Sequence, residues 1–361
     1  MQTDILIIGG GLSGLALADR LERAGADYLL LEARDRLGGR ILSQEVGGAQ
    51  FDLGPAWFWP DQPLMAELVE RLDLGVFEQY SSGDIASEDR QGTVHRRMGF
   101  SSMQGTYRVK GGFGALDVGL SRILSSQRIR LESRVVSLSW AQKEVIAKVI
   151  SGAGESLVRA KRVVLAVPPR VAVSNIAFNP SLPEAAADAL AAIPTWMAGQ
   201  AKILAIYDRP HWREAGLSGD AMSQKGPMVE IHDASPADGG PYALFGFVGF
   251  PVEVRHSHRT EMMGMAKEQL VRLFGAKMLN PTALNLQDWA QQDLTATKAD
   301  NISDSYHPAY RYPQAARGLW EDQLLLGSTE VASEFGGFLE GALVAARDAA
   351  LTIVQPVRNF A

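Results

Sequence analysis

Three glycines near the N-terminus are spaced as G-x-G-x-x-G, and an acidic residue follows them. Gly9, Gly11 and Gly14 come directly after the apolar run DILII, residues 4–8. Glycines at these positions permit a tight turn, so that a pyrophosphate can approach the backbone at the N-terminus of the next helix. Glu32 comes 18 residues after Gly14, where a carboxylate can accept hydrogen bonds from ribose hydroxyls. The chemistry indicated is the binding of a dinucleotide.

The elements that would position these residues follow in order along the chain. Residues 4–8 form a short continuous apolar run, as in a central strand of a parallel sheet. Apolar residues then recur at helical spacing over residues 13–24, and a second apolar strand spans residues 28–31. This order favours a Rossmann-like βαβ unit over a glycine-rich turn in an unrelated α/β protein. Because an acid at Glu32 would repel a 2′-phosphate, the cofactor is NAD or FAD.

The stretch LEARDRLGGR, which contains Glu32, places three arginines and a Gly-Gly pair directly after the second strand. The segment resembles the second fingerprint of FAD-binding proteins in the flavin-containing monoamine oxidase superfamily. That resemblance implies that Glu32 binds the adenosine ribose and that Arg34 lies along the adenosine. It also implies that Gly38, Gly39 and Arg40 approach the pyrophosphate and the flavin. A buried diphosphate is well matched by a guanidinium group and free backbone donors.

Further segments extend the resemblance over most of the chain. FDLGPAWF, residues 51–58, resembles the element that approaches the flavin ring, although Pro55 stands where a second glycine is usual and removes a backbone N–H. VKGGFGALDVGL, residues 109–120, resembles the segment that opens a helix on return to the nucleotide domain, and Val135 then falls where the family's backbone contacts adenine. In the closing segment LLLGSTEVASEFGGFLEGALVAARDAA, the resemblance implies that Glu330 approaches the ribityl–diphosphate.

The glycine motif and the resemblance together imply one set of cofactor-binding residues. They are Gly9, Gly11, Leu12, Ser13, Gly14, Glu32, Ala33, Arg34, Gly38, Gly39, Arg40, Leu53, Gly54, Pro55, Ala56, Trp57, Val135, Trp289, Ser328, Glu330, Gly337 and Phe338. The cofactor implied is FAD. Because the chain has no cysteine, FAD cannot be linked through sulfur and is expected to bind non-covalently.

A lysine in the second half of the chain is the main catalytic candidate. In MAGQAKILAIYDRPHW, Lys202 precedes Trp212 by ten residues. This spacing resembles the strand of amine oxidases whose lysine reaches the flavin N5 through a water and assists the reaction with oxygen. A cation on an otherwise apolar strand is costly to bury without a partner, which favours a function over a lysine at a strand edge in solvent.

The family often flanks the substrate nitrogen with two aromatic rings that face the flavin. One position falls at Phe338, which is therefore the second catalytic candidate. The other falls near Lys298 or Ala299, where no aromatic residue stands. Either another ring supplies the second wall or the substrate is not a simple amine. The candidate rings are Trp57, Trp59 and Tyr310.

The predicted fold class is α/β, with a discontinuous Rossmann-like FAD-binding domain of the GR2 type and a second, substrate domain. The FAD-binding domain is expected over residues 1–60, 106–180 and 284–361, and the substrate domain over residues 61–105 and 181–283. The second domain should combine a mixed sheet with a few helices. It contains two strand patterns rich in aliphatic and aromatic residues, AKILAIYDRPHW and PYALFGFVGF, and one amphipathic helical pattern, TEMMGMAKEQLVRLFG. The short first insertion indicates a site that is more open or differently shaped than is usual in the family.

Composition sets the remaining bounds. The chain has 361 residues, 46% hydrophobic and 21% charged, with a net charge of −6, so nothing indicates nucleic acid or an anionic membrane surface as a partner. No apolar run approaches the ~18 residues of a membrane span, and the first strand begins too near the N-terminus for a secretory signal. We therefore expect a cytoplasmic protein without a membrane anchor, monomeric or homodimeric. The six histidines lack metal-binding spacing, so no metal is expected.

The resemblance implies an FAD-dependent amine oxidase whose partners are a small-molecule amine and O2. Hydride passes from the carbon beside the amine nitrogen to flavin N5, the imine is hydrolysed, and oxygen reoxidises the flavin to give hydrogen peroxide. Two alternatives stay open. One is an FAD-dependent desaturase or dehydrogenase that acts on a C–C bond or uses another electron acceptor. The other is a non-catalytic FAD-binding subunit, which would not need Lys202.

Overall fold

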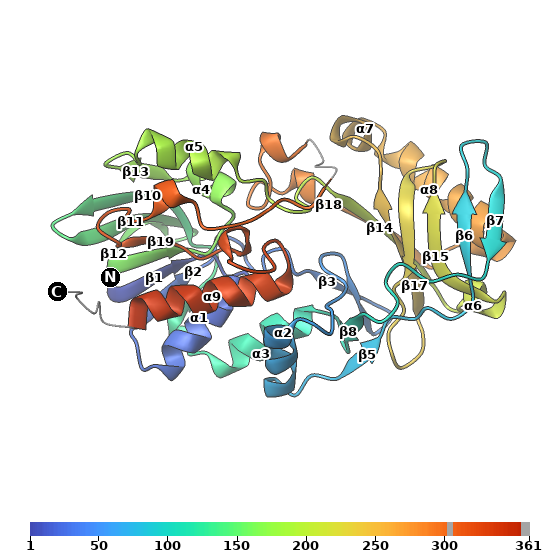
Figure 1. The fold of residues 1–361 in the computed structure, drawn as a ribbon, viewed down its shortest axis with the longest axis horizontal. Coiled ribbons are helices and arrows are strands. Elements are labelled where there is room, and N and C mark those ends of the chain that lie inside the picture. Colours follow the sequence, from blue (N-terminus) through green and yellow to red (C-terminus); the bar gives the residue numbers. More distant parts are fainter. Residues whose placement is uncertain (302–305, 355–361) are drawn as a thin grey trace.

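The computed structural model describes residues 1–301 and 306–354, most of whose strands form two β-sheets toward opposite ends of the long axis (Figure 1). The strands of the eight-stranded sheet are β1 (Gln2–Ile8), β2 (Tyr28–Leu31), β9 (Ile129–Arg130), β10 (Arg134–Ala141), β11 (Glu144–Ser151), β12 (Gly154–Leu165), β13 (Ala177–Asn179) and β19 (Leu324–Leu326). Those of the seven-stranded sheet are β6 (Asp84–Glu88), β7 (Val94–Arg97), β14 (Ala201–Tyr207), β15 (Leu217–Ser223), β16 (Met228–Asp233), β17 (Tyr242–Val248) and β18 (Ala283–Asp288). Two small ribbons pair β3 (Ser43–Val46) with β4 (Ala49–Asp52) and β5 (Val76–Glu78) with β8 (Tyr107–Val109).

Helices cover both faces of the eight-stranded sheet (Figure 1). On one face lie α1 (Leu12–Arg23), α2 (Pro63–Arg71), α3 (Gly114–Ile123) and α9 (Leu339–Val354), and on the other α4 (Pro169–Asn175) and α5 (Glu184–Ala192). Side chains of β1 alternate between these layers, because Ile7 packs with the first and Leu6 with the second. Burial on both faces is why residues 4–8 read as a continuous apolar run.

The predicted βαβ unit is present. β1 pairs in parallel with β2 on one side and with β12 on the other. The helix expected over residues 13–24 is α1, and the second strand has the expected bounds. The glycine turn therefore stands at the carboxyl end of a central parallel strand, where α/β sheets bind their ligands.

The register of β14 directs Lys202 toward the glycine-rich half of the molecule. β14 is buried along its whole length, in a sheet of the order β18-β14-β17-β16-β15-β6-β7. Ile203 packs in the core beneath α8 (Arg259–Phe274), whereas Leu204 packs in another core with Phe51 and Trp57. Lys202 shares the face of Leu204, because side chains alternate along a strand.

The remaining helices, α6 (His211–Glu214) and α7 (Val252–Ser257), accompany the seven-stranded sheet with α8. α8 ends at Phe274 and Gly275 is its C-cap, so the predicted helical segment TEMMGMAKEQLVRLFG stops at its glycine as expected. Among the helices of residues 1–301 and 306–354, none combines the length and the apolar composition needed to span a membrane.

Three segments differ from the predicted domain boundaries. Residues 283–288, almost all of which are expected in the last piece of the FAD-binding domain, form β18 and pair with β14 in the seven-stranded sheet. α2 and α5 are expected in the substrate domain, but Met65 of α2 and Leu190 of α5 are fully buried in the cores beside the eight-stranded sheet. Strand pairing and helix packing are non-local, so local composition does not determine which sheet an isolated element joins.

Gly14 sets how closely α1 packs onto β1. A Cβ on Gly14 would lie 1.9 Å from the carbonyl oxygen of Gly9, a backbone atom that cannot turn aside. We expect Gly14→Ala to lower the free energy of unfolding by about 3 kcal/mol, measured by urea denaturation. Gly264→Ala in α8 is the matched control, because its Cβ would meet no atom within 4 Å, and it should stabilise by ~0.5–1 kcal/mol or be neutral. Equal stabilities of the two variants would contradict the close packing at Gly14.

Candidate active site

A cavity of about 360 Å³ connects the glycine turn after β1 with side chains of the seven-stranded sheet. Most of the predicted site residues line it. They are Gly9, Gly11, Leu12, Ser13, Glu32, Arg34, Gly38, Gly39, Arg40, Leu53, Gly54, Pro55, Ala56, Trp57, Lys202, Trp289, Ser328, Gly337 and Phe338. Residues from the N-terminal, central and C-terminal thirds of the chain thus meet at one site.

Four predicted residues lie elsewhere. Gly14 does not line the cavity, because it faces the backbone of Gly9 and serves the packing of α1. Ala33 and Val135 line a smaller neighbouring cavity of about 60 Å³ at the same carboxyl edge of the sheet. Glu330 is fully buried and borders a separate groove, which is also lined by residues 308–315 and Arg317.

The glycine turn and the Gly38-Gly39 pair form one backbone surface beside the N-terminus of α1. The Gly38 N–H donates to the Gly10 carbonyl at 2.9 Å. A Cβ on Gly39 would lie only 3.2 Å from the Cα of Gly11, so a side chain there would crowd the turn. Bare backbone next to a helix N-terminus fits a diphosphate, because the N–H groups and the helix dipole both favour an anion.

Glu32 is oriented by the backbone around it. Its Oε2 accepts from the Gly10 N–H at 2.7 Å and its Oε1 from the Arg34 N–H at 2.8 Å. Each carboxylate oxygen has a second lone pair, so Glu32 can still accept from a ribose hydroxyl. The Arg34 guanidinium donates to Thr295 Oγ1 at 2.8 Å and so closes the same end of the cavity.

An ion pair between a partly exposed arginine and a buried carboxylate links the arginine-rich segment to the closing segment of the chain. Arg40 Nη1 lies 2.6 Å from Oε1 of Glu330, whose side chain is fully buried. Glu330 Oε2 and the hydroxyl of Ser328 have no hydrogen-bond partner among the described residues. Buried polar atoms without partners are uncommon in native proteins and indicate a polar ligand. These groups fit FAD: Arg40 and the glycine backbone would hold the diphosphate, Ser328 would face the ribityl chain, and Glu330 would hold Arg40 in position from behind.

Lys202 lines the same cavity, beside the residues that follow β4. Its Nζ donates to the carbonyl oxygen of Gly54 at 2.7 Å and to that of Asp52 at 3.3 Å. The ammonium group also lies 4.0 Å from the ring centroid of Phe245 and 5.5 Å from that of Phe247. Carbonyl dipoles and ring faces both stabilise a cation, so the structure shows the partners that a buried lysine requires.

The charge of Lys202 changes within the physiological pH range. Burial lowers the pKa of Lys202 to about 7, while Asp52 opposes the shift and Arg108 adds to it. Burial also raises the pKa of Asp52, against the effect of its hydrogen bond from Ser43 and the charge of Arg108. A lysine that loses its proton near neutral pH is a common feature of active sites.

Aromatic rings form much of the cavity wall. Phe338 lies edge-on to Trp59, with ring centroids 5.7 Å apart, and stacks on the imidazole of His307 at 4.7 Å. Trp57 and Trp59 both line the cavity. Two of the three rings proposed as a second wall are thus in place, and Trp59 directly contacts Phe338.

The third candidate ring points elsewhere. The hydroxyl of Tyr310 donates to the Pro194 carbonyl at 2.9 Å, and its side chain lines the separate groove. Neither Lys298 nor Ala299 lines the cavity. Trp196, six residues before Lys202, lines it instead, and its proximity in sequence to Lys202 is the signal that could have identified it.

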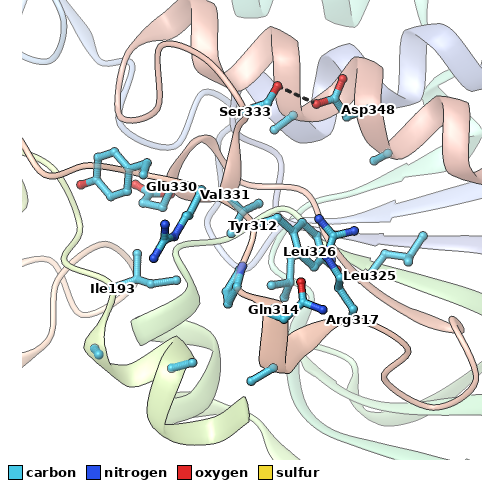
Figure 2. A pocket seen from close by; sticks show the side chains of 18 of the residues that line it. Ile193, Tyr312, Gln314, Arg317, Leu325, Leu326, Glu330, Val331, Ser333 and Asp348 are labelled. Carbon is cyan, nitrogen blue, oxygen red and sulfur yellow. Dashed lines mark hydrogen bonds between the residues drawn. The ribbon is translucent and has the colours of Figure 1, made fainter. Parts of the chain in front are cut away.

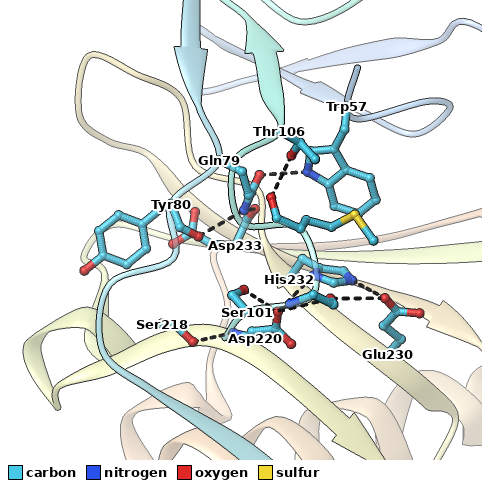
Figure 3. Close-up of polar contacts among 12 residues, drawn as sticks. Trp57, Gln79, Tyr80, Ser101, Thr106, Ser218, Asp220, Glu230, His232 and Asp233 are labelled. Atoms are coloured by element: carbon cyan, nitrogen blue, oxygen red, sulfur yellow. Dashed lines mark hydrogen bonds and ion pairs between the residues drawn. The ribbon is translucent and has the colours of Figure 1, made fainter. Parts of the chain in front are cut away.

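Glu230 on β16 is a carboxylate that sequence analysis did not single out. It lines the cavity with 28% of its side chain exposed, and its Oε1 lies 2.8 Å from His232 Nε2 (Figure 3). Residues two apart on a strand share a face, so the alternating pattern of MVEIHD was the available signal. Other lining residues not identified from the sequence are Ile41, Gln62, Met103, Ala166, Val167, Pro168, Met197, Gln200, Ala201, Phe247, Leu294, Thr295, Thr329, Leu339 and Ala342.

A larger groove, about 1060 Å³, lies apart from these residues. Figure 2 shows Ile193, Tyr312, Gln314 and Arg317 around it, with the Ser333–Asp348 hydrogen bond beyond them. It contains neither the glycine turn nor Lys202. The candidate active site is therefore the smaller cavity, because that cavity is lined by most of the predicted site residues.

Comparisons with known proteins agree with this arrangement. The sequence profile of the family described as flavin containing amine oxidoreductase matches residues 78–354, and that of an NAD(P)-binding Rossmann-like domain matches residues 7–72. The chain belongs to the flavin containing amine oxidoreductase family. It is therefore an FAD-dependent oxidoreductase that acts on amines, and the predicted α/β fold with a Rossmann-like FAD-binding domain and a second mixed-sheet domain is confirmed.

Relatives of this amine oxidoreductase are distant but match over most of their length. The chain is 23% identical to the probable flavin-containing monoamine oxidase A of Dictyostelium discoideum, over 94% of this chain and 95% of that protein. It is also 23% identical to the putrescine oxidase of Kocuria rosea, over 82% and 84% respectively.

Solved structures show the same fold. Wild-type putrescine oxidase bound to putrescine superposes with a TM-score of 0.81 at 21% identity, over 98% of this chain and 100% of that one. Cyclohexylamine oxidase from Brevibacterium oxydans IH-35A gives a TM-score of 0.80 at 20% identity, over 98% of each chain.

Proposed function

We propose that this amine oxidoreductase transfers a hydride from the carbon beside an amine nitrogen to N5 of FAD, with oxygen as the electron acceptor and hydrogen peroxide as a product. The observation that carries the proposal is the position of Lys202. It places a buried amine group in the wall of the same cavity that has the features of an FAD site. Bound FAD supplies the redox chemistry, since it accepts two electrons from the substrate and returns them to oxygen.

The residues of the chain orient the substrate and exclude water. Trp57, Trp59 and Phe338 give the cavity apolar walls against which an amine can be held in one orientation. A neutral amine stabilises the forming imine with its own electron pair as the C–H bond breaks, so no side chain need act as a strong base. Lys202 supplies positive charge where negative charge develops on oxygen.

An amine panel tests the proposed reaction. The holoenzyme is mixed under air with primary and secondary amines, polyamines and amino acids, and hydrogen peroxide is measured against the amine consumed. We expect one peroxide for each amine oxidised. Flavin reduction by amines without peroxide would point to another electron acceptor. Reduction by C–C substrates but by no amine would favour a desaturase.

Glu230 is expected to attract the amine in its cationic form. Glu230→Gln removes the negative charge and keeps the shape, so the KM for amines should rise about tenfold, while flavin reduction at saturating amine changes little. Steady-state and stopped-flow kinetics separate the two effects. The matched control is Glu268→Gln on the exposed side of α8, which should leave KM unchanged. An unchanged KM in Glu230→Gln would remove this role.

Cellular location and assembly remain predictions from the sequence. We expect the protein in the cytoplasm, as a monomer or a homodimer.

A further inference from the structure

A buried histidine lies between two carboxylates behind the cavity wall (Figure 3). His232 is 1% exposed, and its Nε2 is 2.8 Å from Glu230 Oε1. Its Nδ1 is 3.7 Å from Oδ2 of Asp220 on β15. The edge of Trp57, 4.9 Å away, and the ring of Phe245, 5.5 Å away, cover the imidazole. Both ring nitrogens therefore face acidic groups and are shielded from solvent.

Asp220 ties this cluster to the chain segment that carries a further cavity residue. Its Oδ2 accepts from the Ser102 N–H at 2.8 Å, from the Ser102 hydroxyl at 3.2 Å and from the Ser101 hydroxyl. Met103, the next residue, lines the cavity. The two serines donate hydrogen bonds but carry no charge. They therefore do not neutralise the negative charge of Asp220 beside His232.

The other elements around His232 bring no positive charge to the imidazole within the described residues. β17 contributes Phe245, and the segment after β4 contributes Trp57. Asp233, the next residue on β16, is held instead by Arg213 at 2.7 Å. Lys202 lines the same cavity but lies against Phe245 and the carbonyls of Gly54 and Asp52.

The surroundings of His232 favour the imidazolium. Burial by itself lowers the pKa of His232, but the hydrogen bonds and charges of Asp220 and Glu230 outweigh it, and the pKa is raised above its ordinary value. Burial by itself raises the pKa of Asp220, but the nearby His232 and the hydrogen bonds from Ser101 and Ser102 hold that pKa below its usual value. Only the doubly protonated ring can donate toward both carboxylates at once.

We propose that His232 is a pH-dependent counter-charge to Glu230 that sets how strongly the cavity attracts amine cations. The inference rests on the proposed function and adds a residue that tunes substrate recognition. At low pH the imidazolium offsets one of the two carboxylates. As the pH rises through the His232 pKa, the proton leaves and the cluster becomes more negative by one charge. Because the neutral ring can still donate from Nε2, Glu230 keeps its orientation while its attraction for cations grows.

This arrangement suits the chemistry of an amine substrate. A protonated amine has no free electron pair and cannot lose hydride. At acidic pH nearly all of the substrate is in that unreactive form, and the His232 imidazolium weakens its capture. At higher pH, where an amine bound as a cation can release its proton, Glu230 attracts it fully.

The test uses a permanent cation, benzyltrimethylammonium, which neither titrates nor can be oxidised at the cationic nitrogen by this route. Its affinity for the holoenzyme is measured by calorimetry across the pH range of histidine titration. We expect wild-type affinity to rise about tenfold from the acidic to the alkaline end. His232→Gln should bind the cation more tightly than wild type at the acidic end and equally at the alkaline end. Lys202 loses its charge in the same pH range, so the comparison of each variant with wild type at the same pH, and not the wild-type rise alone, isolates His232.

A purely structural role for His232 would not tighten cation binding at acidic pH in the variant. In that case His232→Gln would bind the cation equally or more weakly at acidic pH, and that result would overturn the proposal. The matched control is His95→Gln on β7, an exposed histidine, which should keep the wild-type profile. Asp220→Asn is a second variant, for use if His232→Gln does not fold. It removes a charge that stabilises the imidazolium and should move the transition to lower pH, and an unmoved transition would likewise overturn the proposal.

Binding of this probe requires no turnover, so the two ideas fail separately. If no amine reduces the flavin but the His232 effect on cation affinity is present, the proposed function fails and the counter-charge stands. If amines are oxidised but His232→Gln does not change the acidic affinity, only the counter-charge fails.

Discussion

Lys202→Met should slow reoxidation of the reduced enzyme by oxygen roughly 100-fold, while reduction of the bound flavin by an amine changes no more than a few fold. The Nζ group donates to the Gly54 and Asp52 carbonyls at 2.7 and 3.3 Å, so these hydrogen bonds hold its charge in one position. Methionine keeps a similar length and apolar packing but has no charge. Stopped-flow mixing of reduced enzyme with oxygen, and of oxidised enzyme with amine, measures the two half-reactions separately.

The pH dependence gives this prediction a sign. Burial lowers the pKa of Lys202 to about 7, so the lysine carries its charge below that pH and loses it above. The advantage of wild type over Lys202→Met in reoxidation should therefore be largest at acidic pH and shrink as the pH rises through about 7. Equal reoxidation rates in the two proteins, or an advantage that grows with pH, would contradict a role for the lysine charge.

Arg40→Met should destabilise the protein and weaken FAD binding together. The substitution leaves the carboxylate of Glu330 buried without its partner at 2.6 Å. Removing one member of a buried ion pair typically costs about 3–5 kcal/mol, because the remaining charge is uncompensated. Urea denaturation of the apoprotein measures the stability, and titration with FAD measures the affinity for the cofactor.

The double variant Arg40→Met with Glu330→Gln separates these two effects. Removing the stranded charge should recover much of the stability. It should not recover FAD affinity, because the guanidinium that would hold the diphosphate is still missing. If Arg40→Met is as stable as wild type, the ion pair with Arg40 does not offset the cost of burying the charge of Glu330. If the double variant binds FAD as wild type does, Arg40 does not contact the cofactor.

The part of the site that could be predicted is encoded by short-range patterns. The apolar run, the glycine spacing, the helical repeat and Glu32 all lie within the first 32 residues, so one βαβ unit contains its own positional information. The sequence also predicts which residues lie on the same face of β14 as Lys202, because side chains alternate along a strand. What the sequence lacked was the identity of the surface that this face would meet.

The part that could not be predicted depends on pairings between distant segments. Glu230 reaches the cavity only because β16 pairs with β17 and β17 pairs with β14, which places it in the sheet that carries Lys202. The placement of β18 beside β14 depends on the same long-range pairing. Tyr310 was a reasonable candidate by residue type, but a hydrogen bond to the Pro194 carbonyl holds it in another groove. Local patterns show which residues share a face of a strand, but they do not show which strand lies beside it.

The most direct test of the central claim is anaerobic mixing of the purified, FAD-loaded protein with the amine panel. Absorbance of the oxidised flavin is followed in a stopped-flow instrument in the absence of oxygen. We predict that at least one class of amine bleaches the flavin in a single turnover, and that Glu230→Gln requires more of the same amine for half-maximal rate. A protein that binds FAD but whose flavin no amine bleaches would contradict the proposed reaction.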